Sequence, residues 1–211
     1  MSTNNNQFFD VQALGYDKPG TIQRAEAVAE QIRRQLPIRS DMSALDYGAG
    51  TGLVSFALRP YLHSITAADN SQGMLEILRK KIESQGVDGI TPVLCDLSEH
   101  GLDGARFDLI YSSMTMHHIP DVPGLLKTMY NLLKPGGFIA ISDLDAEDGS
   151  FHLNATEVHH HGFEREEIMR LLEQAGFLDV KVVTAHKFSK EVEGGDVREF
   201  SVFLATGRFR G

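Results

Sequence analysis

The chain of 211 residues has a single cysteine, few basic residues and no long apolar run. One thiol cannot form an internal disulfide, so we expect Cys95, which lies in an apolar run, to be a buried thiol in a reducing cytoplasm. No run approaches the roughly 20 apolar residues of a membrane span, and the N-terminal MSTNNNQFF lacks the features of a secretion signal. The net charge of −9 disfavours general attraction to nucleic acid or anionic lipid. We therefore expect a cytoplasmic protein without nucleic-acid or membrane partners.

Short apolar runs alternate with amphipathic stretches along most of the chain. The expected strands are 44–47, 64–69, 91–95, 107–112 and 138–142, and the expected helices are 22–36, 71–84, 122–133 and 164–175. This alternation is typical of a parallel sheet covered on both faces. Two final strands, 179–184 and 200–206, have no helix between them, which predicts an antiparallel pair at one sheet edge.

The stretch LDYGAGTGLVS, residues 45–55, places glycine at positions 48, 50 and 52. Glycine permits unusual backbone angles and close ligand approach, so this pattern indicates a binding turn, although an ordinary tight turn would look the same. The turn follows the first strand, and ligands of parallel α/β sheets bind beyond the carboxyl ends of the strands. A nucleotide-like ligand is therefore expected at this edge.

Two acids end the second and third expected strands. Asp69 ends the second strand, 17 residues after Gly52, where a carboxylate can accept from both hydroxyls of a ribose; the alternative is a helix-capping acid. Asp96 ends the third strand, where it could accept from the exocyclic amine of adenine while the amide of Leu97 meets a ring nitrogen. A solvated loop acid is the alternative for Asp96.

These segments resemble the class I S-adenosylmethionine-dependent methyltransferases. LDYGAGTG is similar to the first motif of that family, ITAADNSQGML to its ribose-binding acid and following helix, and VLCDL to its adenine motif. FDLIYSSMTMHHIPD, LLKPGGFIAISDLD and FEREEIMRLLEQAGFLDVKVV resemble the later motifs in the family's order. The resemblance implies a Rossmann-like three-layer sandwich with a seven-stranded, mostly parallel sheet whose last strand is antiparallel. FFDVQALGYDKPG resembles a cap segment, which implies a cap over residues 1–20 and the methyltransferase domain over 21–211.

The resemblance also assigns the cofactor, S-adenosyl-L-methionine, and its product, S-adenosyl-L-homocysteine. The implied contacts place the methionine tail over Gly48, Ala49, Gly50 and Gly52, with Asp46 and the Ser112 carbonyl near its ammonium. The ribose would lie on Asp69. The adenine would lie between Asn70 and Met74, with its edge on Asp96 and Leu97. Met74 could equally be a core residue. A negative lining suits a ligand that carries a sulfonium and an ammonium.

Methyl transfer requires alignment of the acceptor behind the methyl group more than it requires catalytic groups. His117 and His118 lie in the loop that should face the methyl, so either could act as a base, or both could simply hold the loop. Tyr16, His160 and His161 are candidates for the acceptor pocket. His152 and the histidines at 159–161 hint at a metal, but adjacent histidines do not readily converge on one ion, so no metal site is expected.

Three functions stay open from the sequence. A methyltransferase acting on a small molecule leads, because the chain is acidic and carries no large appended domain; a protein acceptor is not excluded. An NAD-linked dehydrogenase is disfavoured because GAGTG lacks the third glycine of the dinucleotide motif. A non-catalytic cofactor-binding module is the third. The segment SSMT, residues 112–115, lacks the acid or amide, the prolines and the aromatic residue of enzymes that methylate base amines.

Overall fold

The computed structural model describes residues 9–97, 102, 104–152 and 158–211. Seven strands form one sheet in the order β3-β2-β1-β4-β5-β7-β6. The strands are β1 Ser43–Tyr47, β2 Ser64–Asp69, β3 Ile90–Leu94, β4 Phe107–Ser113, β5 Leu133–Leu144, β6 Leu178–Glu191 and β7 Val197–Arg208. The pairs from β3 to β5 are parallel, and β7 is antiparallel to both β5 and β6. The predicted Rossmann-like fold is confirmed.

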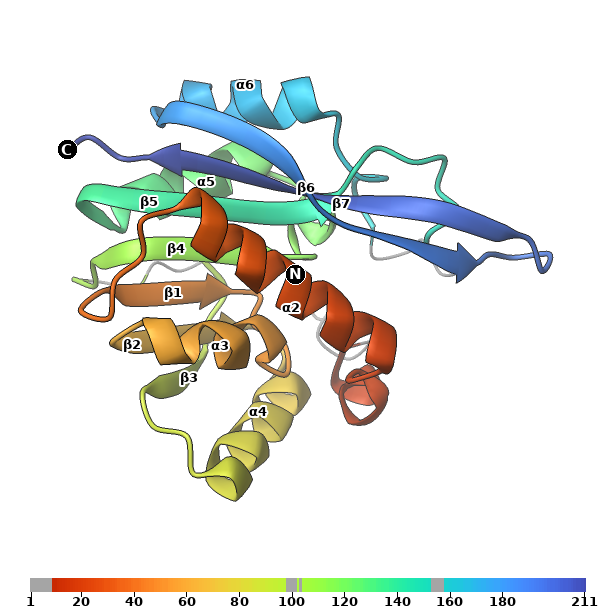
Figure 1. The fold of residues 1–211 in the computed structure, drawn as a ribbon, viewed down its shortest axis with the longest axis horizontal. Helices are drawn as coiled ribbons and strands as arrows, with labels where there is room; N and C mark the ends of the chain where they lie inside the picture. Colours follow the sequence, from red (N-terminus) through yellow and green to blue (C-terminus); the bar gives the residue numbers. More distant parts are fainter. Residues whose placement is uncertain (1–8, 98–101, 103, 153–157) are drawn as a thin grey trace.

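Helices cover both faces of the sheet (Figure 1). The helices are α2 Pro19–Gln35, α3 Leu53–Leu58, α4 Gln72–Gln85, α5 Val122–Asn131 and α6 Arg165–Ala175, with 3-10 turns η1 Ala13–Gly15, η2 Arg59–Tyr61 and η3 Met116–His118. Apolar residues of α2, α3 and α4 pack in one core cluster, and those of α5 and α6 pack in the other. Because side chains alternate along a strand, Leu109 and Tyr111 enter the first core and Ile110 the second.

The C-terminal hairpin is longer than the sequence pattern predicts. β6 and β7 pair as far as Glu191 and Val197, with register shifts between Leu178 and Lys181 and between Thr184 and His186. The turn is closed by the amide of Val192, which donates to the carbonyl of Asp196 at 2.8 Å, and Gly194 and Gly195 supply positive φ angles of 97° and 87°. In Figure 1 this hairpin extends beyond the helices that cover the rest of the sheet.

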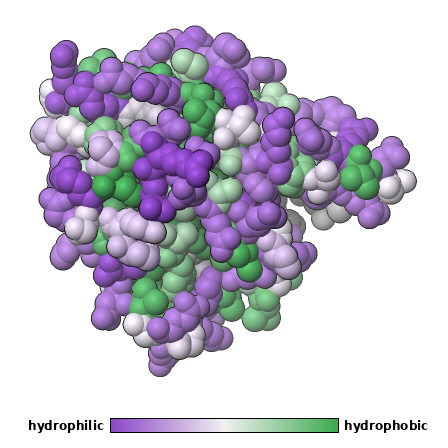
Figure 2. Space-filling view, in the orientation of Figure 1, coloured by the Kyte–Doolittle hydropathy of each residue, from purple (hydrophilic) through white to green (hydrophobic). Residues whose placement is uncertain are grey.

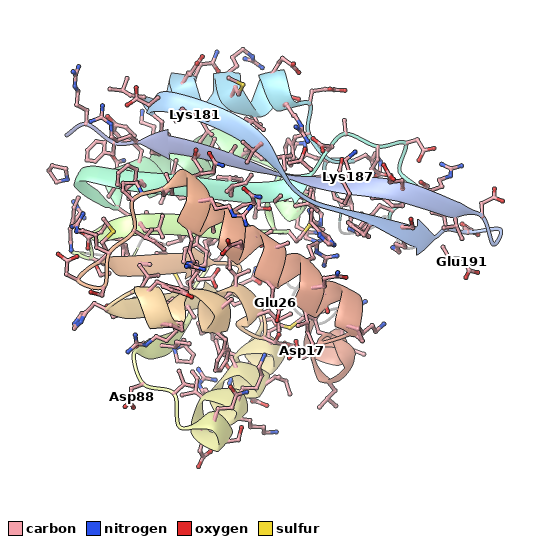
Figure 3. All side chains as sticks on the ribbon, in the orientation of Figure 1. Asp17, Glu26, Asp88, Lys181, Lys187 and Glu191 are labelled. Carbon is pink, nitrogen blue, oxygen red and sulfur yellow. The ribbon has the colours of Figure 1, made fainter. Side chains whose placement is uncertain are left out.

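The N-terminal segment is fastened to the domain by two aspartates. Oδ1 of Asp10 accepts from the hydroxyl of Ser71 at 2.6 Å and from the amide of Gly73 at 2.7 Å, at the N-terminus of α4. Asp17, labelled in Figure 3 where the segment meets α2, pairs with Nζ of Lys81 at 2.8 Å. Helix α2 already begins at Pro19, so the expected boundary at residue 20 falls within its first turn.

The face seen in Figure 2 is largely hydrophilic, with hydrophobic residues in separate small groups. In the described part of the chain, no helix combines the length and the apolar character that crossing a membrane would require.

Candidate active site

A cleft opens where the strands β1 to β4 end and where the N-terminal segment crosses them. Its lining residues are Phe9, Tyr16, Tyr47, Gly48, Gly50, Asp69, Asn70, Met74, Cys95, Asp96, Ser113, Met114, Thr115, His118, Ile119 and Pro120. A side lobe that includes Arg24, Asp46, Ala49 and Thr51 shares five of these residues: Tyr16, Gly48, Gly50, Ser113 and Met114. The cleft and the side lobe therefore adjoin each other at the edge where the sequence predicts a ligand.

The three glycines of the turn have different surroundings. All have positive φ angles, from 54° to 81°. A Cβ on Gly48 would lie 2.2 Å from Oγ1 of Thr115, and a Cβ on Gly52 would lie 2.4 Å from Cδ1 of Leu78. A Cβ on Gly50 would have its nearest atom 4.0 Å away. Gly50 is thus the position that faces open space, whereas a side chain at Gly52 would meet Leu78 of helix α4.

Asp69 holds the glycine turn against the next strand. Its Oδ2 accepts from the amide of Gly50 at 2.7 Å, and its Oδ1 accepts from the amide of Ser71 at 2.8 Å. Burial raises the pKa of the Asp69 carboxyl, and the hydrogen bonds from these amides counteract part of that rise. One carboxylate therefore joins β1 and β2 at the floor of the cleft.

Asp46 lies beneath the side lobe in a buried polar network. Its Oδ2 accepts from the hydroxyl of Ser55 at 2.7 Å, and that hydroxyl lies 3.2 Å from the Tyr111 hydroxyl. Burial is the largest influence and raises the pKa of Asp46 to about 7, although the Ser55 hydrogen bond lowers it and Asp69 raises it further. A cationic group in the side lobe would favour the ionised carboxylate.

The predicted adenine residues gather at the end of β3. Nδ2 of Asn70 donates to Oδ2 of Asp96 at 3.3 Å, and both residues line the cleft. Met74 is 2% exposed, as the core interpretation expects, and it also lines the cleft, where a ligand could contact it. Leu97 is 2% exposed, and its side chain packs in the second core cluster rather than lining the cleft.

The chain after β4 contributes cleft residues that the sequence did not single out. Ser112, the predicted residue, is buried and its hydroxyl donates to the Tyr47 carbonyl at 2.8 Å. The lining residues are instead Ser113, Met114 and Thr115. Met114 has a φ of 57°, rare for a residue with a side chain. The backbone thus turns sharply here, which one sequence does not reveal.

The paired histidines occupy different environments. His117 is 1% exposed; its Nδ1 lies 2.6 Å from Oδ1 of Asp143, and its amide donates to Oδ2 of Asp143 at 3.2 Å. Burial alone would raise the pKa of Asp143, but His117 and backbone amides hold it below its ordinary value. His118 lines the cleft and meets the Phe9 ring edge-on at 5.1 Å between centroids. Of the two, His118 is therefore the one that lines the cleft.

The later histidines hold loops rather than lining the cleft. Nε2 of His160 lies 2.9 Å from the Ile119 carbonyl, and the amides of His159 and His160 donate to the His117 carbonyl at 2.9 and 3.2 Å. Nδ1 of His161 lies 3.7 Å from Oε1 of Glu147. Neither His160 nor His161 is among the described residues that line the cleft, in contrast to the expected acceptor pocket. Tyr16, the third candidate, lines both the cleft and the side lobe.

A Rossmann-like sheet with this glycine turn and these acids defines an α/β protein that binds a nucleotide-like cofactor. The sequence profile of the methyltransferase domain family matches residues 21–182. The chain therefore belongs to the class I S-adenosylmethionine-dependent methyltransferases, and S-adenosylmethionine is the methyl donor of this family. This result does not favour the dehydrogenase interpretation.

The chain is similar to methyltransferases whose names state different acceptors or none. An uncharacterised methyltransferase of Schizosaccharomyces pombe is 32% identical over 160 residues, covering 69% of this chain and 56% of that protein. A malonyl-[acyl-carrier protein] O-methyltransferase of Serratia marcescens is 29% identical over 159 residues, covering 70% and 60%. The structure of Haemonchus contortus phosphoethanolamine N-methyltransferase 2 has a TM-score of 0.77 at 20% identity, covering 99% of this chain and 59% of that one. The chain spans about half to three-fifths of these proteins' lengths.

Proposed function

We propose that this protein is an enzyme that transfers a methyl group from S-adenosylmethionine to a small-molecule acceptor by in-line displacement. The observation that carries the proposal is the cleft itself, which brings Gly50, Asp69 and Asp96 together with Tyr16 and His118 in one lining. Because the sulfonium is already a good leaving group, alignment and exclusion of water can supply much of the acceleration.

The cofactor is proposed to lie along the ends of β1 to β3. Asp69 would accept from the ribose hydroxyls, with Asn70 and Met74 beside the adenine and Asp96 and the amide of Leu97 at its edge. The methionine tail would cross Gly48, Ala49 and Gly50 into the side lobe, where Asp46 offers a carboxylate to the ammonium. Ser113 lines both spaces whereas Ser112 is buried, so we propose the carbonyl of Ser113 as the partner of that ammonium.

The acceptor is proposed to enter between the N-terminal segment and the loop after β4. Phe9, Tyr16, His118, Ile119 and Pro120 surround this part of the cleft. Asp10 and Asp17 fasten the covering segment to α4, which leaves a confined space suited to a small molecule. The relatives' names include an O-methyltransferase and an N-methyltransferase, so the acceptor atom does not follow from kinship. The His117–Asp143 pair is proposed to hold the loop that presents His118.

Calorimetric titration with S-adenosylhomocysteine tests the cofactor site. We expect micromolar binding by the parent protein, and a loss of about 1.5–3 kcal/mol, or roughly 10–100-fold in affinity, in Asp69→Asn, since a hydrogen bond to a charged acceptor is weakened. Asp88→Asn is the matched control, because Asp88 is exposed and precedes β3 at the opposite end of the strand. Equal affinity of Asp69→Asn and the control, or preferential binding of NAD, would overturn the assignment.

The acceptor class is tested with a methyl-labelled donor and a cell extract divided into small-molecule and protein fractions. Label in the small-molecule fraction that depends on the enzyme supports the proposal. Label confined to the protein fraction would make a protein the acceptor. Binding of S-adenosylhomocysteine without transfer to either fraction would favour the non-catalytic module.

A further inference from the structure

Three imidazole rings converge behind the acceptor side of the cleft. His117 and His118 come from η3, and His152 comes from the segment after β5. One ligand nitrogen from each of the three lies within 4.8 Å of the others. Ring centroids are separated by 4.1 Å for His117–His118, 4.8 Å for His117–His152 and 5.9 Å for His118–His152. The consecutive pair and a distant histidine therefore meet, contrary to the expectation that no such site would form.

The surroundings of the three rings suit a metal better than a purely structural contact. Asp143 engages Nδ1 of the buried His117 at 2.6 Å, which leaves Nε2 as the nitrogen that can bind an ion. Metal-binding histidines commonly have their other ring nitrogen fixed by a carboxylate in this way. Among the described residues, the buried Nδ1 of His152 has no hydrogen-bond partner. A buried polar atom without a partner is costly unless something satisfies it.

The spacing of the three ring nitrogens can be compared with that in a tetrahedral metal site. Three nitrogens at about 2.0–2.1 Å from a tetrahedral ion lie roughly 3.4 Å apart, so ring rotations that close the observed spread of 4.8 Å by about 1.4 Å would complete the site.

We propose that His117, His118 and His152 bind one divalent transition-metal ion of the zinc class, with Asp143 orienting His117. Three imidazoles leave a fourth position open, which is the arrangement of catalytic rather than structural zinc. Because His118 also lines the cleft, the proposed ion would lie next to the cleft, and we infer that its open position faces the acceptor.

The consequence for the reaction rests on the proposed function. A hydroxyl acceptor bound at the open position would lose its proton to water more readily, because a bound cation stabilises the oxygen anion. An oxygen lone pair would then form the bond to the methyl carbon while the carbon–sulfur bond breaks and its electrons stay on sulfur, giving S-adenosylhomocysteine. The site thus points to an oxygen acceptor.

Titration of the chelator-treated protein with Co²⁺ and Zn²⁺ tests the site without requiring activity. We expect one Co²⁺ per chain with the intense visible absorption of a four-coordinate ion, and displacement of Co²⁺ by Zn²⁺. His152→Ala and His118→Ala should lose this spectrum. His63→Ala, which removes an exposed histidine at the start of β2, should keep it. Asp143→Asn should bind about 10–100-fold more weakly.

Each outcome decides separately for the metal site and for the proposed function. Co²⁺ binding that is equal in the parent and in His152→Ala, or a weak octahedral spectrum in both, would overturn the metal site. S-adenosylhomocysteine affinity of each variant, measured in parallel, shows that the fold is intact and tests the cofactor site independently. Metal binding without S-adenosylhomocysteine binding would refute only the proposed function.

Discussion

Replacement of Asp46 by asparagine tests the electrostatics of the side lobe. Asp46 is 2% exposed, and its pKa is raised from 3.8 to about 7. Between these values the folded state holds a proton that the unfolded state has lost, so the free energy of unfolding falls as the pH rises from about 4 to about 7 and stays lowered above that. At about 1.4 kcal/mol per pKa unit, roughly three units amount to at most about 4 kcal/mol.

Asp46→Asn is uncharged at every pH and keeps an oxygen that can accept from Ser55. Its free energy of unfolding should therefore lack this fall, so that the variant is close to the parent in stability near pH 4.5 and more stable at pH 8. S-adenosylhomocysteine should bind the variant about 10–100-fold more weakly at pH 8, because the ammonium loses its charged partner. In the parent, affinity should decline below pH 7, where the carboxylate must give up a proton before it can pair with the ammonium.

Urea denaturation and calorimetric titration across this pH range measure the two effects. Parallel stability curves for the parent and Asp46→Asn would refute the raised pKa. An unchanged affinity at pH 8 would refute the placement of the ammonium, whatever the stability curves show.

Three further variants separate folding from binding. Gly52→Ala should be less stable by about 1–3 kcal/mol in urea denaturation, because its Cβ would lie 2.4 Å from Leu78; unchanged stability would mean that α4 yields easily. In Gly50→Ala the added Cβ would have its nearest atom 4.0 Å away, so the free energy of unfolding should fall by only about 1–2 kcal/mol, because of the positive φ. Its S-adenosylhomocysteine affinity should fall more than tenfold, and an unchanged affinity would remove Gly50 from the site. Asp17→Asn breaks the 2.8 Å pair with Lys81 and should speed dissociation of S-adenosylhomocysteine in stopped-flow measurements; an unchanged rate would show that the N-terminal segment does not cover the cofactor.

The accuracy of the predicted elements follows the strength of the apolar pattern. The expected strand 64–69 coincides with β2, because its buried residues are bounded by polar ones. β5 begins at Leu133, five residues before the expected start, since a segment with Pro135 and two glycines argues against a strand. The outer part of the β6–β7 hairpin carries many half-exposed and charged residues. Its strand conformation arises from pairing between the two strands, which a single-chain pattern does not register.

The candidate cofactor site was predictable to the extent that strand ends determine it. Gly50, Asp69 and Asp96 line the cleft because the carboxyl ends of parallel strands meet at one edge. Ser113 lines it where Ser112 was expected, since neighbouring residues of a strand point to opposite faces and the backbone turns at Met114. The residue that lines the cleft is thus one position beyond the expected one, because the backbone path after β4 decides which residue reaches the cleft.

The cluster of His117, His118 and His152 shows why the spacing of residues along the sequence does not predict this part of the site. His152 follows His118 by 34 positions, in a segment without strand or helix periodicity, so no motif joins them. Asp143 was the usable signal, because an acid within the apolar run of β5 must be paired to be buried. β5 pairs with β4 up to Ser113↔Ser142, so the loop after β4 is where that partner must come from, and His117 occupies it. A buried acid near the end of one strand can thus indicate which histidine in the loop after the neighbouring strand pairs with it. The position of that histidine then indicates where the other two imidazole rings of the cluster can meet it.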